Sequence, residues 1–151
     1  MKTIAVLGLG SIGMRHALNL QACGARVIGF DPNGESRAKF QASGGLIAGT
    51  RDAALAEACA AVIASPSRFH LEDLAAAAAA GCHVLAEKPL AHTVDGVSAI
   101  LERFEAQNRT VFAGFNLRLH PVVSMARQWL DEGRLGTLMW ARLQMSDYLP
   151  G

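Results

Sequence analysis

The chain is poor in aromatic residues and carries almost no net charge. Aromatic side chains make up 6% of its 151 residues, and the formal net charge is +1, with acidic and basic residues interspersed. A surface that binds nucleic acid or another polyanion needs a concentrated basic field. The composition therefore argues against a nucleic-acid partner and favours a small-molecule ligand.

Cysteine is also scarce. The three cysteines, Cys23, Cys59 and Cys82, are odd in number and unevenly spaced, which fits neither a disulfide framework nor a zinc site. None of the five histidines is spaced as part of a metal-binding pair. We therefore expect no bound metal and a reducing, cytoplasmic location.

Long apolar runs are missing as well. The alanine-rich stretch from Leu74 to Ala80 is too short and too weakly apolar to span a bilayer, and Gly81 ends it. The apolar start of the chain is interrupted at Arg15 and His16, and no cleavage site follows. We expect no membrane association and no secretion signal.

Short apolar segments rich in β-branched residues alternate with segments of helical periodicity. Strands are predicted at Thr3–Leu7, Arg26–Phe30, Ala61–Ala64, His83–Ala86 and Thr110–Phe115. Helices are predicted at Ser11–Cys23, Glu35–Ala42, Ala53–Cys59, Phe69–Ala80 and Val94–Gln107, with Asp52 and Thr93 as caps. This alternation predicts an α/β fold, a doubly wound parallel sheet with helices on both faces.

The pattern changes after Phe115. Pro121 suits the first turn of a helix that runs to Glu132 and has apolar residues spaced for burial. The alternation at Thr137–Met145 predicts one more strand.

A glycine-rich turn follows the first strand directly. It reads Gly8-Leu9-Gly10-Ser11-Ile12-Gly13. In such a turn the first glycine permits a tight bend, the second makes room for a pyrophosphate, and the third lets the helix lie close to the strand. Unpaired amides at the helix start then face the phosphates. We interpret the turn as a dinucleotide cradle, with Gly8, Gly10, Ser11, Ile12 and Gly13 as cofactor contacts.

Asp31 closes the second strand, where a bound ribose would need an acid. Its carboxylate can accept both ribose hydroxyls and would repel a 2′-phosphate, which favours NAD over NADP. Arg37 and Arg51 could lie close enough to help a phosphate, so NADP stays open. The alternative interpretation is an ordinary glycine turn with Asp31 as a helix cap.

Polar residues follow the third predicted strand at its carboxyl end, the edge where ligands bind in open parallel sheets. They are Ser65, Pro66 and His70, with Ser67 as a candidate helix cap. This loop could face the dinucleotide. His70 could equally be a histidine at a helix start, bonded to local backbone.

The tripeptide Glu87-Lys88-Pro89 follows the fourth predicted strand. Lys88 could orient the nicotinamide amide or hydrogen-bond a substrate hydroxyl whose charge rises as its proton leaves. The alternative is an exposed lysine paired with Glu87. The bond before Pro89 is a candidate for the cis form.

Asn116 and Arg118 follow the last predicted strand of this series. If the chain stays extended there, both point to one side and could hold hydroxyls or a carboxylate of a substrate. Without context they are ordinary polar residues of a loop.

Together these motifs resemble the nucleotide-binding half of the Gfo/Idh/MocA oxidoreductase family, from Lys2 to about Gly136. Glu87-Lys88-Pro89 is the most discriminating of them. The resemblance implies a two-domain NAD(P)-dependent enzyme that oxidises or reduces a carbon–oxygen bond of a sugar, cyclitol or sugar derivative. It implies that Lys88 is catalytic and that Arg118 contacts the substrate. It also implies further cofactor contacts from Ser65, Pro66, His70, Glu87, Lys88 and Asn116.

The resemblance further implies a second α/β domain with most of the substrate contacts, a catalytic histidine and usually the oligomer interface. We therefore assign residues 1–121 to a dinucleotide-binding domain, and residues 122–151 to a linking helix and the first strand of that substrate domain. The chain is then the cofactor half of a homo-oligomeric dehydrogenase, incomplete for catalysis by itself, as a fragment or a truncated product.

Two other functions stay open. One is a non-redox relative that uses NAD transiently while cleaving a glycoside. The other is a nucleotide-binding module without catalysis, or a truncated remnant of an enzyme.

Overall fold

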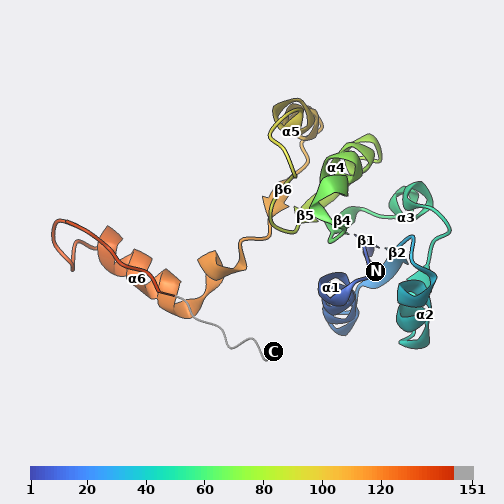
Figure 1. The fold of residues 1–151 in the computed structure, drawn as a ribbon, viewed down its shortest axis with the longest axis horizontal. Coiled ribbons are helices and arrows are strands. Elements are labelled where there is room, and N and C mark those ends of the chain that lie inside the picture. The colour runs from blue at the N-terminus through green and yellow to red at the C-terminus, as the bar shows by residue number, and fades with distance from the viewer. Residues whose placement is uncertain (145–151) are drawn as a thin grey trace. The chain divides into compact units, whose positions relative to one another are not determined.

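The computed structural model describes residues 1–144, and the chain divides into two units, Met1–Gly114 and Phe115–Gly151. The first unit contains a six-stranded sheet in which every strand pairs in parallel with its neighbours (Figure 1). Its strands are β1 (Thr3–Leu7), β2 (Arg26–Phe30), β3 (Leu46–Ile47), β4 (Ala60–Ile63), β5 (His83–Ala86) and β6 (Val111–Ala113).

The strand order is β3-β2-β1-β4-β5-β6. The chain therefore builds outward from β1 to β3, and then crosses back to the other side of β1 to form the second half of the sheet. In open parallel sheets, ligands bind beyond the carboxyl ends of the strands at the point where the order reverses. Here that point lies between β1 and β4.

Helices cover both faces of the sheet, as the alternating pattern predicts. Figure 1 shows α1 and α2 on one side of the strands, and α3, α4 and α5 on the other. The helices of the first unit are α1 (Ser11–Ala22), α2 (Gly34–Ala42), α3 (Arg51–Ala56), α4 (His70–Ala79) and α5 (Val97–Ala106), with the 3₁₀ turn η1 (Ser67–Phe69) before α4. The predicted doubly wound α/β fold is confirmed.

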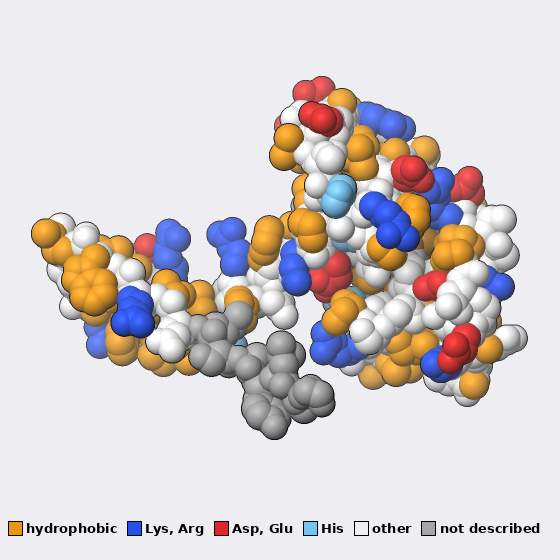
Figure 2. All heavy atoms as spheres, viewed as in Figure 1, with side chains coloured by type: hydrophobic (Ala, Val, Ile, Leu, Met, Phe, Trp, Pro, Cys, Tyr) orange, Lys and Arg blue, Asp and Glu red, His pale blue; other side chains and the backbone are white. Residues whose placement is uncertain are grey.

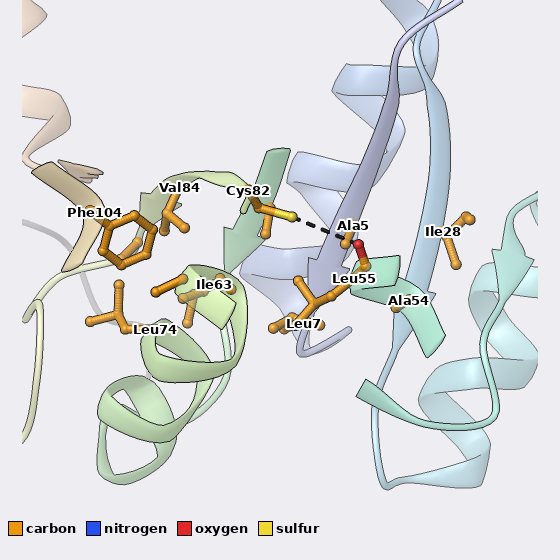
Figure 3. Packing of buried hydrophobic residues seen from close by; sticks show 14 of the residues in the cluster. Ala5, Leu7, Ile28, Ala54, Leu55, Ile63, Leu74, Cys82, Val84 and Phe104 are labelled. Carbon is orange, nitrogen blue, oxygen red and sulfur yellow. Dashed lines mark hydrogen bonds between the residues drawn. The ribbon is translucent and has the colours of Figure 1, made fainter. Parts of the chain in front are cut away.

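The core consists of two clusters, one on each face. Successive side chains of a strand point to opposite faces, so Leu7 of β1 joins the cluster under α3, α4 and α5 while Val6 joins the cluster under α1 and α2. Figure 3 shows the first cluster, in which Leu74 and Phe104 bring α4 and α5 onto the sheet. Because both faces are covered, the central strands are almost entirely apolar.

Several local predictions were wrong at helix starts. Thr50, not Asp52, caps α3 by accepting a hydrogen bond from the Ala53 amide at 3.1 Å. Gly96, not Thr93, precedes the first residue of α5, and no cap hydrogen bond from the Ser67 side chain starts α4. The observed caps lie two or three positions from the predicted ones, a difference that periodicity does not resolve.

The two-residue strand β3 was not predicted. It is too short to show an alternating pattern, and only its pairing of Ile28 with Leu46 and of Gly29 with Ile47 defines it.

The second unit contains the 3₁₀ turn η2 (Asn116–Leu119) and the helix α6 (Pro121–Asp131). His120 caps α6 by accepting a hydrogen bond from the Val122 amide at 3.3 Å, and Pro121 occupies the first turn as predicted. Figure 2 shows hydrophobic side chains gathered over this helix. They were expected to be buried, yet Val122, Met125 and Trp129 are exposed.

The strand predicted at Thr137–Met145 does not form over residues 137–144, and Met145 lies outside the described residues. A strand is defined by hydrogen bonds to a neighbouring strand. No partner strand is present among the described residues of this unit. Residues 137–144 therefore have the alternation of a strand but no described strand in this unit to hydrogen-bond with.

Over the part of the chain that the structure describes, no helix combines the length and the apolar character that a membrane span requires.

Candidate cofactor site

The glycine turn between β1 and α1 has one glycine that faces open space and two that are closely packed. A Cβ placed on Gly13 would lie 1.8 Å from the Gly8 carbonyl oxygen, and one on Gly8 would lie 2.5 Å from the Ser65 amide nitrogen. Gly8 also has a φ of +88°, which favours glycine. A Cβ on Gly10 would meet no atom within 4 Å. Packing therefore requires glycine at positions 8 and 13, and the space beside Gly10 is free for a ligand.

The start of α1 presents free backbone donors at the same place. Gly10 is its N-cap and provides no side-chain hydrogen bond. The first amides of a helix have no partner within the helix. Ser11 and Ile12 are exposed, whereas Gly13 is buried. The helix start can therefore hold an anion such as a phosphate.

Asp31, directly after β2, is held beside the glycine turn. Its Oδ2 accepts a hydrogen bond from the Leu9 amide at 2.7 Å, and its Oδ1 accepts one from the Asn33 amide at 2.8 Å. Asn33 caps α2 by accepting from the Glu35 and Ser36 amides, so the interpretation of Asp31 as the helix cap is wrong. Each carboxylate oxygen keeps acceptor capacity for a further donor, such as a ribose hydroxyl.

The two arginines that were considered for a 2′-phosphate have different places. Arg37 lies beside Asp31, where its Nη1 donates to the carbonyls of Asp31 at 2.7 Å and Pro32 at 3.0 Å. Arg51 instead contacts Asp73, with 3.3 Å between Nη1 and Oδ1. Of these two, only Arg37 is placed to affect the choice between NAD and NADP.

The loop after β4 packs against the glycine turn and is held at three points. The Ser65 hydroxyl donates to Asp73 Oδ2 at 2.6 Å. The Ser65 carbonyl lies 2.7 Å from Nε2 of His70. The Ser65 amide lies next to Gly8. Pro66, which follows, is exposed. This loop therefore has a fixed position at the edge of the sheet.

His70 is buried, with 1% of its surface exposed. Its ring nitrogens face backbone carbonyls on both sides, which leaves the ring no open surface toward a dinucleotide. The interpretation in which it bonds local backbone fits its contact with Ser65, whereas its contact with Pro89 spans 19 positions of the chain.

Asp73 was not singled out from the sequence. Burial raises the pKa of this carboxyl, and hydrogen bonds from Ser65 and Arg51 only partly oppose the rise. Its position three residues after His70 is the one signal that could have revealed it, because residues three apart share a helix face.

Glu87, directly after β5, contacts α1. Its Oε1 accepts a hydrogen bond from Nε2 of His16 at 2.8 Å, and its Oε2 accepts one from the Lys88 amide at 3.3 Å. Burial by itself would raise the pKa of Glu87, but the hydrogen bonds from His16 and Lys88 outweigh it and lower the pKa. His16 was not predicted as part of the site, although it lies three residues after Gly13 and so on the same face of α1.

Lys88 is exposed at the carboxyl edge of the sheet, and the peptide bond to Pro89 is cis. Lys88 is exposed as the alternative interpretation has it, but the ion pair of Glu87 is with His16 and not with the Lys88 ammonium group. Within residues 1–144, Lys88 forms no ion pair. Its ammonium group is therefore available to a ligand.

Asn116 and Arg118 belong to the second unit, in the 3₁₀ turn η2. The chain is not extended there, so the condition under which both side chains would point to one side is not met.

A hollow of about 620 Å³ lies between α3 and α4. Arg51, Leu55 and several alanines of α4 line it. It is formed by the flanks of helices rather than by the ends of strands, which is not where parallel sheets hold nucleotides.

Comparison with known proteins agrees with this geometry. The family model "Oxidoreductase family, NAD-binding Rossmann fold" matches residues 2–115. Inositol 2-dehydrogenase from Streptomyces avermitilis is 37% identical over 142 residues, which cover 88% of this chain and 41% of that protein. UDP-N-acetylglucosamine 3-dehydrogenase from Acidithiobacillus ferrooxidans is 31% identical and covers 82% of this chain and 40% of that protein.

A solved structure shows the same fold. Scyllo-inositol dehydrogenase from Lactobacillus casei, with bound NAD(H) and scyllo-inositol, superposes with a TM-score of 0.83 at 26% identity, over 90% of this chain and 42% of that one. The chain thus spans about 40% of the length of these relatives. By its sequence motifs, its sheet and its family match, the chain belongs to the Gfo/Idh/MocA oxidoreductase family and contains that family's NAD-binding Rossmann domain.

Proposed function

We propose that this chain binds NAD and forms the cofactor half of a dehydrogenase that transfers hydride between NAD and a carbon–oxygen bond of a sugar or cyclitol. The observation that carries the proposal is the arrangement at one edge of the sheet. There the open side of Gly10, the carboxylate of Asp31 and the free ammonium of Lys88 follow β1, β2 and β5.

The glycine turn fits the pyrophosphate of a dinucleotide. The space beside Gly10 lets phosphate oxygens approach the backbone, and the start of α1 offers unpaired amides to them. The amides of Ser11, Ile12 and Gly13 are the proposed donors. Helix N-termini favour negative charge, which adds to the attraction.

Asp31 fits the adenosine ribose. The Leu9 and Asn33 amides hold its carboxylate in place, so it is ready to accept the two ribose hydroxyls without reorganising. A 2′-phosphate would meet this negative charge, and we therefore propose NAD as the preferred cofactor. The Arg37 guanidinium, which donates to the Asp31 and Pro32 carbonyls, reduces that repulsion, so NADP can also bind, with lower affinity than NAD.

Lys88 is the proposed catalytic residue of this half. When bound, NAD supplies the acceptor for the hydride. The Lys88 ammonium can donate a hydrogen bond to the oxygen of the reacting alcohol and stabilise the negative charge that grows there as the alcohol proton passes to the catalytic histidine that the family resemblance implies in the substrate domain. Glu87, held by His16, fixes the chain next to Lys88. Ser65 and Pro66 are proposed to border the cofactor from the loop after β4.

The substrate class is proposed from the relatives. Their names point to inositol and amino-sugar nucleotides, which carry several hydroxyl groups. We propose a polyhydroxylated substrate here, with further contacts from Asn116, Arg118 and a second domain that also forms the interface of a homo-oligomer. The cytoplasmic location remains a prediction from the cysteine pattern.

Calorimetric titration of the chain with NAD and NADP tests the proposal. Wild type should bind NAD more tightly than NADP. Asp31→Ala removes two hydrogen bonds to a charged acceptor, each worth about 1.5 kcal/mol or more. It should therefore weaken NAD binding by roughly 100-fold or more and narrow the preference over NADP. Asp52→Ala, an exposed acid on α3, serves as the control. A folded wild type that binds neither nucleotide would exclude the proposed function.

Lys88→Ala separates cofactor binding from chemistry. Because Lys88 is exposed and supports no packing, we expect the variant to bind NAD within about threefold of wild type. In a protein that joins this chain to a substrate domain, NADH absorbance with inositol as substrate should show a loss of roughly 10²-fold or more. Lys39→Ala on α2 is the matched control. Equal turnover in Lys88→Ala and wild type would contradict the role of Lys88.

A further inference from the structure

His70 makes two contacts that the proposed cofactor site does not use. It is the first residue of α4 and almost completely buried. Its Nδ1 lies 2.8 Å from the carbonyl oxygen of Pro89, and its Nε2 lies 2.7 Å from the carbonyl oxygen of Ser65. One ring therefore joins the loop after β4 to the loop after β5, on adjacent strands of the sheet.

The chemistry of these partners limits the state of the ring. A carbonyl oxygen accepts hydrogen bonds and cannot donate one. A neutral imidazole has a single N–H and can donate to only one of the two carbonyls, whereas an imidazolium has an N–H on both nitrogens. Both contacts are hydrogen bonds only when the ring is protonated.

The carboxyl group of Asp73 can balance the positive charge of the protonated His70 ring. Asp73 lies one turn further along α4 with 6% of its surface exposed. Burial raises the pKa of Asp73, and the hydrogen bonds from Ser65 and Arg51 and the charge of His70 act against that rise. Asp73 from α4 and Arg51 from α3 are thus the charged groups set against this part of the loop after β4. On the loop after β5, Glu87 is paired with His16, and Lys88 and His92 are exposed.

We infer that His70 is a positioning residue whose protonated ring braces the loop after β4 against Pro89, and so holds the adjoining Lys88 at the cofactor edge. The neutral ring keeps only one of the two hydrogen bonds and releases one loop. The position of Lys88 therefore depends on pH. The inference rests on the proposed function only for the role of Lys88. The two hydrogen bonds of the His70 ring belong to the ligand-free chain.

Nuclear magnetic resonance of the ligand-free chain tests the brace. Ring ¹⁵N shifts of His70 and the backbone amide shift of Leu90 are followed from about pH 5.5 to about pH 8.5. At low pH both ring nitrogens should carry a hydrogen. As the pH rises and the ring loses one of these hydrogens, the amide shift of Leu90 should change with the same midpoint pH as the ring ¹⁵N shifts. His70→Gln should lose this shift.

The matched controls are His16→Gln and His92→Gln, since His16 contacts the loop after β5 and His92 belongs to it. Both variants should keep the Leu90 shift at the His70 midpoint. A Leu90 shift that survives in His70→Gln would overturn the inference. So would a wild-type ring with one N–H at every pH at which the chain is folded, and this measurement decides the matter even if His70→Gln does not fold. No nucleotide is present, so a failure of NAD binding in the calorimetric titration leaves the outcome unaffected.

Discussion

Replacing Gly10 by alanine should weaken dinucleotide binding while leaving the fold intact. Gly10 has φ −65° and ψ −172°, a conformation that alanine adopts without strain, and its added Cβ would meet no atom of the protein within 4 Å. Alanine is a slightly poorer N-cap than glycine but loses less chain entropy on folding. These two effects are each below about 1 kcal/mol and opposite in sign. We therefore expect little change in the free energy of unfolding.

The same methyl group would occupy the space through which a pyrophosphate approaches the backbone. Forcing an extra methyl group into a close contact costs about 1–3 kcal/mol, which corresponds to roughly a 5- to 150-fold weaker NAD affinity. Calorimetric titration with NAD and urea unfolding of the same sample measure the two quantities together. NAD affinity within about twofold of wild type in a folded Gly10→Ala variant would refute the assignment of this turn as the cradle.

Gly13→Ala is the matched comparison, because it tests space used for packing instead of space left for a ligand. Its Cβ would lie 1.8 Å from the Gly8 carbonyl oxygen, so α1 would have to move away from the turn. We expect a loss of about 3 kcal/mol or more in the free energy of unfolding. The two alanine variants should therefore differ in stability although they lie three residues apart in one motif.

Two carboxyl groups should give opposite dependences of stability on pH, measured by urea unfolding at a series of pH values. The pKa of Glu87 is lowered in the folded chain, so its contribution is present above its unfolded value near 4.5 and is lost as the pH falls through the lower folded value. Glu87→Gln should remove this rise of stability with pH, and an unchanged slope would contradict the His16–Glu87 contact. The pKa of Asp73 is raised, so the folded chain binds the proton more tightly, and stability should fall as the pH rises from 3.8 through the folded value. Asp73→Asn should abolish that fall; Asp52→Asn, at an exposed acid, should not.

The strand positions illustrate what local sequence can predict. The predicted strand at Thr3–Leu7 and that at Arg26–Phe30 match β1 and β2, because buried parallel strands are continuous apolar segments bounded by glycine and polar residues. The two-residue β3 gave no such signal. The strand at Thr137–Met145 had the right alternation but no partner among residues 137–144 and the rest of the described second unit. Alternation can be read from one segment alone, whereas a strand forms only when that segment hydrogen-bonds to a second segment.

The candidate site divides in the same way. The glycine spacing, Asp31 and Lys88 could be identified because each follows a predicted strand, and the carboxyl ends of parallel strands share one edge. The contacts that hold these residues were not visible. His16 reaches Glu87 across 71 positions of the chain, and His70 reaches Pro89 across 19. Periodicity carries no information on such pairs, because it describes neighbours within one element.

By itself, the sequence determined the alternation of strands and helices, the glycine turn and the acid and lysine at the strand ends, because these depend on backbone geometry and residue type over a few positions. Only the tertiary structure decided that Gly10 is open while Gly13 is packed, that Arg37 and not Arg51 lies beside Asp31, and that the His70 ring spans two loops. These facts depend on how the sheet brings distant loops to one edge, and the strand order that does so arises from the packing of the whole domain.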